Sequence, residues 1–108
     1  MKKLFKIGEL AKEIGITVRC LHHYDQIGLL QPKAARESGH RLYDQKDLER
    51  LQQIVSLKSI GLSLEQITQC LDEEAYDLRQ VLSVQDAAVA QEISSLQNVQ
   101  RTLRIMMD

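Results

Sequence analysis

Aromatic residues are scarce in this sequence. They make up 4% of the 108 residues, and tryptophan is absent. A hydrophobic core must therefore be built from Leu, Ile, Val and Ala, as is usual in small helical domains. The hydrophobic content of 44% is sufficient for such a core. The length allows one domain, or one small domain with an extension.

Long apolar runs are also missing, since no hydrophobic stretch extends beyond a few residues. A membrane-spanning helix needs about 20 consecutive apolar residues, so we expect no membrane partner. The basic N-terminus is followed by Gly8 and Glu9, which come too early for the apolar core of a signal peptide. These features predict a cytoplasmic protein.

Cysteine is rare, with only Cys20 and Cys70 present. Their separation does not match a zinc site, and a cytoplasmic location argues against a disulfide. The sequence also contains no phosphate-binding glycine loop, zinc-hydrolase motif or nucleophile elbow. We therefore expect no catalytic residue, no metal and no cofactor, and predict that the protein is not an enzyme.

The net charge is only -1, but the charges are unevenly distributed along the chain. Residues 1–60 carry 11 Lys and Arg against 7 Asp and Glu, whereas residues 61–108 carry 3 against 8. A basic first half joined to an acidic second half indicates that only the first half meets phosphate. Ordinary scatter of surface charge is the alternative.

Two short helices are predicted near the N-terminus. The first covers Ile7–Ile14 and ends at Gly15, which supplies a left-handed turn. Thr17 can then cap a second helix that runs to about Ile27 and stops at Gly28. Two short helices joined by a glycine-containing turn are typical of a helix-turn-helix. DNA is therefore the first partner to consider.

The start of the second helix carries the candidate base-reading residues. The guanidinium of Arg19 can bind O6 and N7 of guanine together, which is worth about 1–3 kcal/mol of discrimination. Thr17 and Val18 precede it and are expected to face the same groove.

The next residues of this helix are candidates for contacts with phosphate. His22, His23 and Tyr24 can reach phosphate oxygens, which set the register on DNA without reading its sequence. For Tyr24 the alternative is a tyrosine at the edge of the core. The two histidines are adjacent and point about 100° apart on a helix, so they are not expected to share a metal.

Residues 33–43 are predicted to form a small β-hairpin, or wing. Pro32 favours an extended backbone before it, Ser38 and Gly39 are a turn signal, and residues 41–43 alternate like a short strand. A basic hairpin next to a helix-turn-helix suits flanking phosphates, although a solvated loop with incidental charges is the alternative. The candidate contacts, with one further lysine downstream, are Lys33, Arg36, Arg41, Tyr43 and Lys58.

Two further helices follow the hairpin. Asp44 and Asp47 resemble a capping box, and the helix that they open should close at Gly61. Ser63 and Gln66 form a second capping box before a short amphipathic helix. Its pattern breaks at residues 72–75.

A long helix is predicted from about Ala75 to Met107, because neither glycine nor proline occurs there. At about 1.5 Å per residue it would be roughly 45 Å long. Such a helix would leave an apolar stripe in water, so we predict a homodimer formed by a parallel or antiparallel helix pair; packing of the stripe on the chain's own core is the alternative. The stripe follows an imperfect heptad pattern and consists of Leu82, Val89, Ile93, Leu96, Val99, Leu103 and Met106.

Together these motifs resemble the MerR family of bacterial transcription regulators, over about residues 4–71. The variant with His22, His23 and Tyr24 looks most like the TipA/Mta subgroup, whose members respond to drugs. The segments that carry the resemblance are Ile7–Ala11, Thr17–Arg19, Leu21–Leu30, Gly39–Tyr43, Asp47–Leu48 and Ile60–Ile67.

The resemblance implies a mainly α fold, with a winged helix-turn-helix DNA-binding domain in residues 1–73 and a dimerisation helix in residues 75–108. It also implies an antiparallel coiled-coil homodimer. Such a dimer would bind a pseudo-palindromic promoter spacer and distort it so that RNA polymerase can engage the promoter, which implies an activator. By position, Thr17, Val18 and Arg19 would lie in the major groove.

The family's ligand domain normally follows the long helix, and no effector-binding domain is present in these residues. We therefore expect either an N-terminal fragment or a short member without an effector. The alternative function is a dimeric protein-interaction adaptor without specific DNA binding. An arginine-to-alanine change at Arg19 would distinguish the two.

Overall fold

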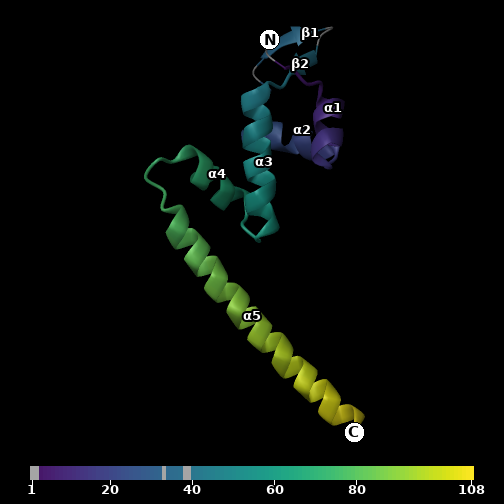
Figure 1. Ribbon diagram of the computed structural model, residues 1–108, viewed down its shortest axis with the longest axis vertical. Helices are drawn as coiled ribbons and strands as arrows, with labels where there is room; N and C mark the ends of the chain where they lie inside the picture. The colour runs from purple at the N-terminus through teal and green to yellow at the C-terminus, as the bar shows by residue number, and fades with distance from the viewer. Residues whose placement is uncertain (1–2, 33, 38–39) are drawn as a thin grey trace.

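The computed structural model describes residues 3–32, 34–37 and 40–108. Within these ranges the chain forms helices and one two-stranded antiparallel sheet, and the last helix extends away from the others (Figure 1). This agrees with the predicted mainly α fold. The elements are α1 (Ile7–Ile14), α2 (Val18–Gln26), β1 (Ala34–Glu37), β2 (His40–Leu42), α3 (Gln45–Ser59), α4 (Leu64–Asp72) and α5 (Leu78–Met107).

The helix-turn-helix forms where the glycine after α1 and the capping threonine before α2 predict it. Gly15 has a φ of 85° after α1, and its N–H donates to the carbonyl of Ala11 at 2.9 Å. The Oγ1 of Thr17 accepts a hydrogen bond from the Cys20 N–H at 3.0 Å, which satisfies one of the free donors at the start of α2. The predicted cap at Thr17 is therefore confirmed, and α2 ends within one residue of the predicted Ile27.

The predicted hairpin is also present. Strands β1 and β2 are antiparallel, with Ala34 opposite Leu42. Immediately after β2, Tyr43 exchanges two backbone hydrogen bonds with Phe5, of 2.8 and 2.9 Å. This bridge ties the end of the hairpin to the N-terminus. The predicted turn at Ser38 and Gly39 lies outside the described residues.

Both predicted capping boxes open their helices. The Asp44 carboxylate accepts from the Asp47 N–H at 2.9 Å, and the Asp47 carboxylate accepts from the Asp44 N–H at 3.0 Å. Ser63 and Gln66 make the equivalent reciprocal pair at the start of α4. Each cap of this kind contributes about 1 kcal/mol, so the ends of α3 and α4 are set locally.

One buried apolar cluster holds the first four helices together. Each helix contributes a side chain that is completely covered, and Phe5 and Tyr43 close the cluster from the hairpin side. Full burial of each such aliphatic side chain is worth about 1.5–3 kcal/mol. The fully covered aliphatic residues of these helices are Leu10, Leu21, Leu51, Ile54 and Ile67, and Leu29 and Leu30 join them from the segment after α2.

Helix α5 begins later than the sequence predicted. Asp77 accepts a hydrogen bond from the Gln80 N–H at 3.1 Å and caps the helix, so residue 75 belongs to the preceding connection. At its base, Gln85 Nε2 donates to the Ile60 carbonyl at 2.9 Å, which joins α5 to the end of α3. No described helix is both long and apolar enough to span a bilayer.

The predicted apolar stripe of α5 is exposed along its whole length. The exposed fraction of its side chains lies between 39% at Leu82 and 77% at Met106, and no residue of α5 is buried. The stripe therefore does not pack on the chain's own core, which removes the alternative considered for it. Val81 alone among the α5 residues packs against the core cluster.

Gly61 and Gly28 offer a matched test of the contact at the base of α5. Gly61 has a φ of 92°, and an added Cβ would meet Gln85 Nε2 at 2.5 Å, whereas Gly28 has a φ of 75° and open space around it. Gly28→Ala should lower the free energy of unfolding by about 1–2 kcal/mol, because alanine is strained in a left-handed backbone conformation. Gly61→Ala should lower the free energy of unfolding by roughly 1 kcal/mol more than this, because the new Cβ also disturbs the hydrogen bond from Gln85 to the Ile60 carbonyl. Equal losses in urea unfolding would contradict this.

Burial of Tyr43 predicts a loss of stability at high pH. The pKa of Tyr43 is raised to about 12, mainly by burial and also by the nearby carboxylates of Asp25 and Asp47, while Arg41 opposes the shift. The folded pKa exceeds the unfolded value of about 10, so the stabilisation is complete below pH 10 and is lost as the pH rises towards 12.

The size of this effect can be isolated with Tyr43→Phe. The free energy of unfolding of the wild type should fall by about 2 kcal/mol more than that of Tyr43→Phe between roughly pH 9 and 12. Tyr24, whose pKa is also raised to about 12, remains in both proteins. Urea titrations across this range measure the difference. Parallel pH profiles would show that the Tyr43 hydroxyl does not contribute.

Candidate nucleic-acid interface

The candidate interface is the exposed side of α2. Leu21 and Tyr24 face the core, whereas the cap Thr17 and the first two helical residues, Val18 and Arg19, are exposed at its N-terminal end. Val18 keeps 37% of its surface accessible, which is high for an apolar side chain. The predicted base-reading residues therefore lie together at the free end of a helix that is anchored by its other side.

The two histidines continue this exposed surface. His22 lies one helical turn after Val18, and His23 one turn after Arg19, so two adjacent rows of side chains run along α2. Both histidines are exposed. Among the described residues, no group of three potential metal ligands includes them.

Tyr24 lies in the core. Only 5% of its surface is exposed, and burial together with a hydrogen-bonding interaction with Cys20 raises the pKa of Tyr24 to about 12. This favours the core-edge alternative for Tyr24 over a phosphate contact. Cys20 lies one turn before Tyr24 on α2, so its thiol interacts with the side chain of this buried tyrosine.

Tyr43 corrects a sequence-based expectation. It was expected to contact the DNA backbone from the hairpin, but its side chain is 1% exposed and belongs to the core cluster. The backbone bridge to Phe5 turns it inward. In this conformation its hydroxyl cannot reach a phosphate.

The basic residues of the predicted interface are only partly brought together. Arg41 is exposed on β2, where its backbone lies opposite that of Arg36. Lys58 is exposed in the last turn of α3, whose other end adjoins the hairpin (Figure 1). Arg41 and Lys58 therefore lie towards opposite ends of α3, which is about 20 Å long. Lys33 and the side chain of Arg36 lie outside the described part of the chain.

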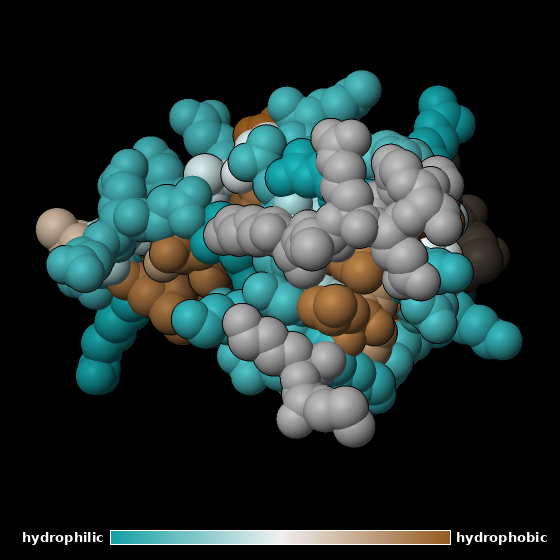
Figure 2. All heavy atoms as spheres, turned by 90° about the horizontal axis from the view of Figure 1, so that it is seen from above, coloured by the Kyte–Doolittle hydropathy of each residue, from teal (hydrophilic) through white to brown (hydrophobic). Residues whose placement is uncertain are grey.

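Viewed from the hairpin end, the surface is mainly hydrophilic, with smaller apolar patches between the polar side chains (Figure 2). A largely polar face with a few exposed apolar groups is compatible with a wet, charged partner such as nucleic acid.

Arg50 is a structurally important residue that the sequence patterns did not identify. From the middle of α3, its Nε donates to the Leu29 carbonyl at 2.7 Å and its Nη2 lies 2.8 Å from Oδ1 of Asp72. Both partners are distant in sequence, so no local pattern could reveal them. The only available signal was a charged residue adjacent to the apolar positions of an amphipathic helix.

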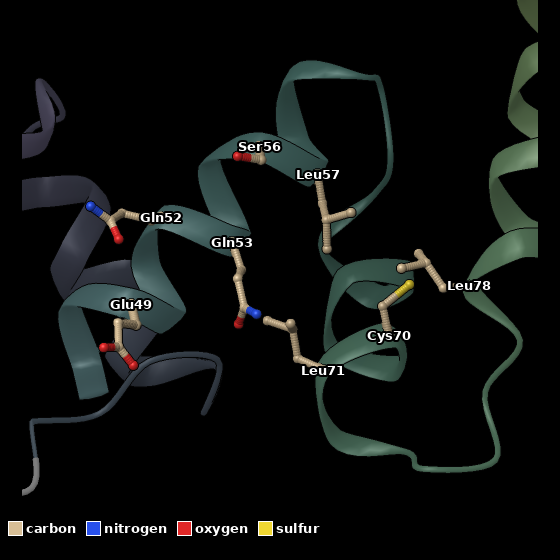
Figure 3. Close-up of a pocket in the computed structure, with 8 residues that line it drawn as sticks. All are labelled: Glu49, Gln52, Gln53, Ser56, Leu57, Cys70, Leu71 and Leu78. Carbon is tan, nitrogen blue, oxygen red and sulfur yellow. The ribbon is translucent and has the colours of Figure 1, made fainter. Parts of the chain in front are cut away.

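A second surface feature lies away from α2. An open cleft of about 630 Å³ separates α3 from α4 and the start of α5. Its polar side chains come from α3, whereas Cys70, Leu71 and Leu78 supply an apolar wall (Figure 3). Burial raises the pKa of Cys70, so this thiol stays protonated at neutral pH. The cleft contains none of the predicted DNA-contacting residues.

Sequence relatives place this chain among bacterial regulators. It is 41% identical over 95 residues to the HTH-type transcriptional activator TipA of Streptomyces coelicolor, covering 88% of this chain and 38% of TipA. It is 43% identical over 81 residues to the HTH-type transcriptional activator mta of Bacillus subtilis, covering 75% of this chain and 32% of mta. The chain therefore spans between about a third and two fifths of these relatives.

Solved structures show the same fold. The N-terminal part of the Bacillus subtilis multidrug transporter activator, MtaN, matches with a TM-score of 0.86 and 35% identity over 95% of this chain and 97% of MtaN. HiNmlR, a MerR family regulator lacking the sensor domain and bound to promoter DNA, matches with a TM-score of 0.61 and 30% identity, over 89% of this chain and 77% of HiNmlR.

A third structure, the EcmrR–DNA complex in EcmrR-RPo, matches with a TM-score of 0.73 and 26% identity, over 85% of this chain and 34% of EcmrR. The profile described as MerR, DNA binding matches residues 48–106. The profile of the MerR HTH family regulatory proteins matches residues 5–74, which is more than half of the chain. The chain belongs to the MerR HTH family of regulatory proteins.

Proposed function

We propose that the chain binds promoter DNA specifically as a homodimer and activates transcription. The observation that carries this proposal is the exposed N-terminal end of α2, where Thr17, Val18 and Arg19 stand opposite the buried side of the same helix. A short helix that packs on the core with one side and is exposed at its N-terminal end is suited to enter the major groove.

In this proposal the three residues at the start of α2 read base edges. Arg19 binds O6 and N7 of a guanine, and the exposed methyl groups of Val18 suit an apolar contact such as a thymine methyl. Thr17 is held at the groove by its own capping bond to the Cys20 N–H. The helix N-terminus adds a favourable dipole towards the nearby phosphates.

Contacts with the DNA backbone set the register. His22 and His23 are exposed on α2 just after its base-reading end, Arg41 is exposed on β2, and Lys58 is exposed in the last turn of α3. We assign Lys33 and Arg36 of the wing to the same role on the basis of sequence. Tyr43 is buried and makes no such contact in this proposal, and Tyr24 contributes by holding α2 against the core.

The proposed dimer forms through α5, so that residues 1–73 bind DNA and residues 75–108 dimerise. The exposed stripe is the main support, because water would otherwise solvate all seven of its apolar side chains. The charges favour an antiparallel pair. Asp86 and Glu92 lie in the first half of α5 with Arg79, after the capping residue Asp77, whereas Arg101 and Arg104 lie near its end, before Asp108.

The regulatory role is inferred from the relatives. TipA and mta carry the name of transcriptional activators, and HiNmlR and EcmrR were solved with DNA. We propose that this chain likewise acts at promoters, distorting the spacer for RNA polymerase. Bending of this size costs several kcal/mol, supplied by added contacts with the DNA backbone. The proposal places the protein in the cytoplasm and assigns it no catalytic activity.

Selection of genomic DNA fragments bound by the protein tests the proposal directly. We expect the enriched fragments to contain two inverted half-sites at a fixed separation, because a symmetric dimer presents two copies of α2. A set without a shared inverted motif would contradict specific binding. In that case the dimeric adaptor function would be favoured.

Removal of the main base-reading group should reduce specificity more than general DNA affinity. Arg19→Ala should weaken binding to the selected operator by about 10- to 100-fold per half-site and relax discrimination at one base pair. Arg79→Ala, which removes an exposed arginine from α5, is the matched control and should bind as the wild type does. Fluorescence anisotropy with operator and point-substituted duplexes measures both effects. Unchanged base preference in Arg19→Ala would rule out this role.

A charge within the apolar stripe should disrupt the dimer. Leu96 is 65% exposed in the single chain, and Leu96→Asp should weaken self-association by at least about 100-fold, because it would bury an unpaired carboxylate. Ser94→Asp adds the same charge to the opposite side of α5 and should remain dimeric. Sedimentation velocity over a range of concentrations distinguishes them. Equal behaviour of the two variants would contradict pairing through the stripe.

A further inference from the structure

Arg50 joins two parts of the molecule that the proposed function needs to hold in register. Its guanidinium uses two different nitrogens for two different partners. Nε donates to the carbonyl of Leu29, and Nη2 pairs with the carboxylate of Asp72. The side chain is 23% exposed, so it is largely enclosed between these partners.

The Leu29 side of this connection is fixed to α2. The N–H groups of Leu29 and Leu30 both donate to the carbonyl of Tyr24, at 2.9 and 3.2 Å. Gln31 Nε2 donates to the carbonyl of Asp25 at 3.3 Å. A displacement of the Leu29 carbonyl would therefore move the last turn of α2 with it.

The Asp72 side leads to α5. Asp72 is the last residue of α4, and only residues 73–77 separate it from Leu78, where α5 begins. A few residues further on, Gln85 bonds to the Ile60 carbonyl at the end of α3. The base of α5 is thus held from two sides, by Gln85 directly and by Asp72 through α4.

We propose that Arg50 is a positioning residue that holds α4 and the base of α5 at a fixed orientation to α2, and thereby sets which half-site separation the dimer accepts. This inference rests on the proposed function. Two copies of α2 can match two half-sites only if each is held rigidly relative to the shared α5 pair. A planar guanidinium fits this role because two of its nitrogens are held at fixed positions, whereas the ammonium of a lysine has one nitrogen on a flexible chain and does not fix the two partners in the same geometry.

A positioning residue affects the orientation between α2 and α5, whereas a stabilising residue affects the free energy of unfolding. Asp72 is 48% exposed, and ion pairs this accessible contribute little to the free energy of unfolding. Loss of the pair should therefore leave the fold intact while widening the range of orientations between α2 and α5.

The test compares Asp72→Asn with Glu73→Gln, a matched neutralisation of the neighbouring exposed carboxylate. The probes are duplexes carrying the selected half-sites at the optimal separation, at one base pair more and one base pair less, and a duplex with a single half-site. Thermal unfolding of each variant is measured in parallel. Arg50→Lys is a second variant, which keeps the positive charge but lacks the planar guanidinium with its two separate donor nitrogens.

Asp72→Asn should reduce the preference for the optimal separation by about fivefold or more, the lower end of typical coupling between distant sites. Binding to the single half-site and the unfolding midpoint should stay as in the wild type, and Glu73→Gln should keep the full preference. Arg50→Lys should lose the same spacing preference. If Arg50→Lys does not fold, the result for Asp72→Asn alone tests the proposal. Unchanged spacing preference in Asp72→Asn would overturn the proposal, as would an equal loss on every duplex with a lower unfolding midpoint.

The same experiment separates this inference from the proposed function. If the wild type binds the two-site duplex no better than the single half-site, the dimeric DNA-binding function fails whatever the variants do. If the wild type shows spacing preference and Asp72→Asn retains it, only the role of Arg50 fails.

Discussion

The position of α2 depends on burial of one of its sides. Leu21 is completely covered and Tyr24 nearly so, both within the cluster that also contains Leu10, Leu51 and Ile54. Each such side chain contributes about 1.5–3 kcal/mol, more than any single contact on the exposed side. Because the buried side is fixed, the opposite side is fixed as well. The residues proposed to read DNA therefore owe their placement to apolar packing behind them.

Local signals explain why much of the fold was predictable. The cap at Thr17 and the boxes at Asp44 and Ser63 each act within four residues, so their effect can be read from the chain directly. The exposed stripe of α5 was also predictable, because heptad spacing is a property of the sequence alone. The family itself was recognisable from motifs around α2 and the hairpin.

Long-range contacts explain what was missed. Tyr43 was a candidate DNA contact because it belongs to the predicted basic hairpin, but it bridges to Phe5 and is buried in the core. Arg50 and Gln85 bind carbonyls more than twenty residues away, at Leu29 and Ile60, which no sequence window contains. The later start of α5 depends on a choice between neighbouring acidic residues, of which Asp77 provides the cap.

We propose that two copies of α2, held apart by paired α5 helices, enter the major groove of one operator. Methylation protection at guanine N7, which lies in the major groove, tests this most directly. We expect two protected clusters related by two-fold symmetry in the bound operator. Binding without N7 protection, or with a single protected cluster at saturation, would contradict it.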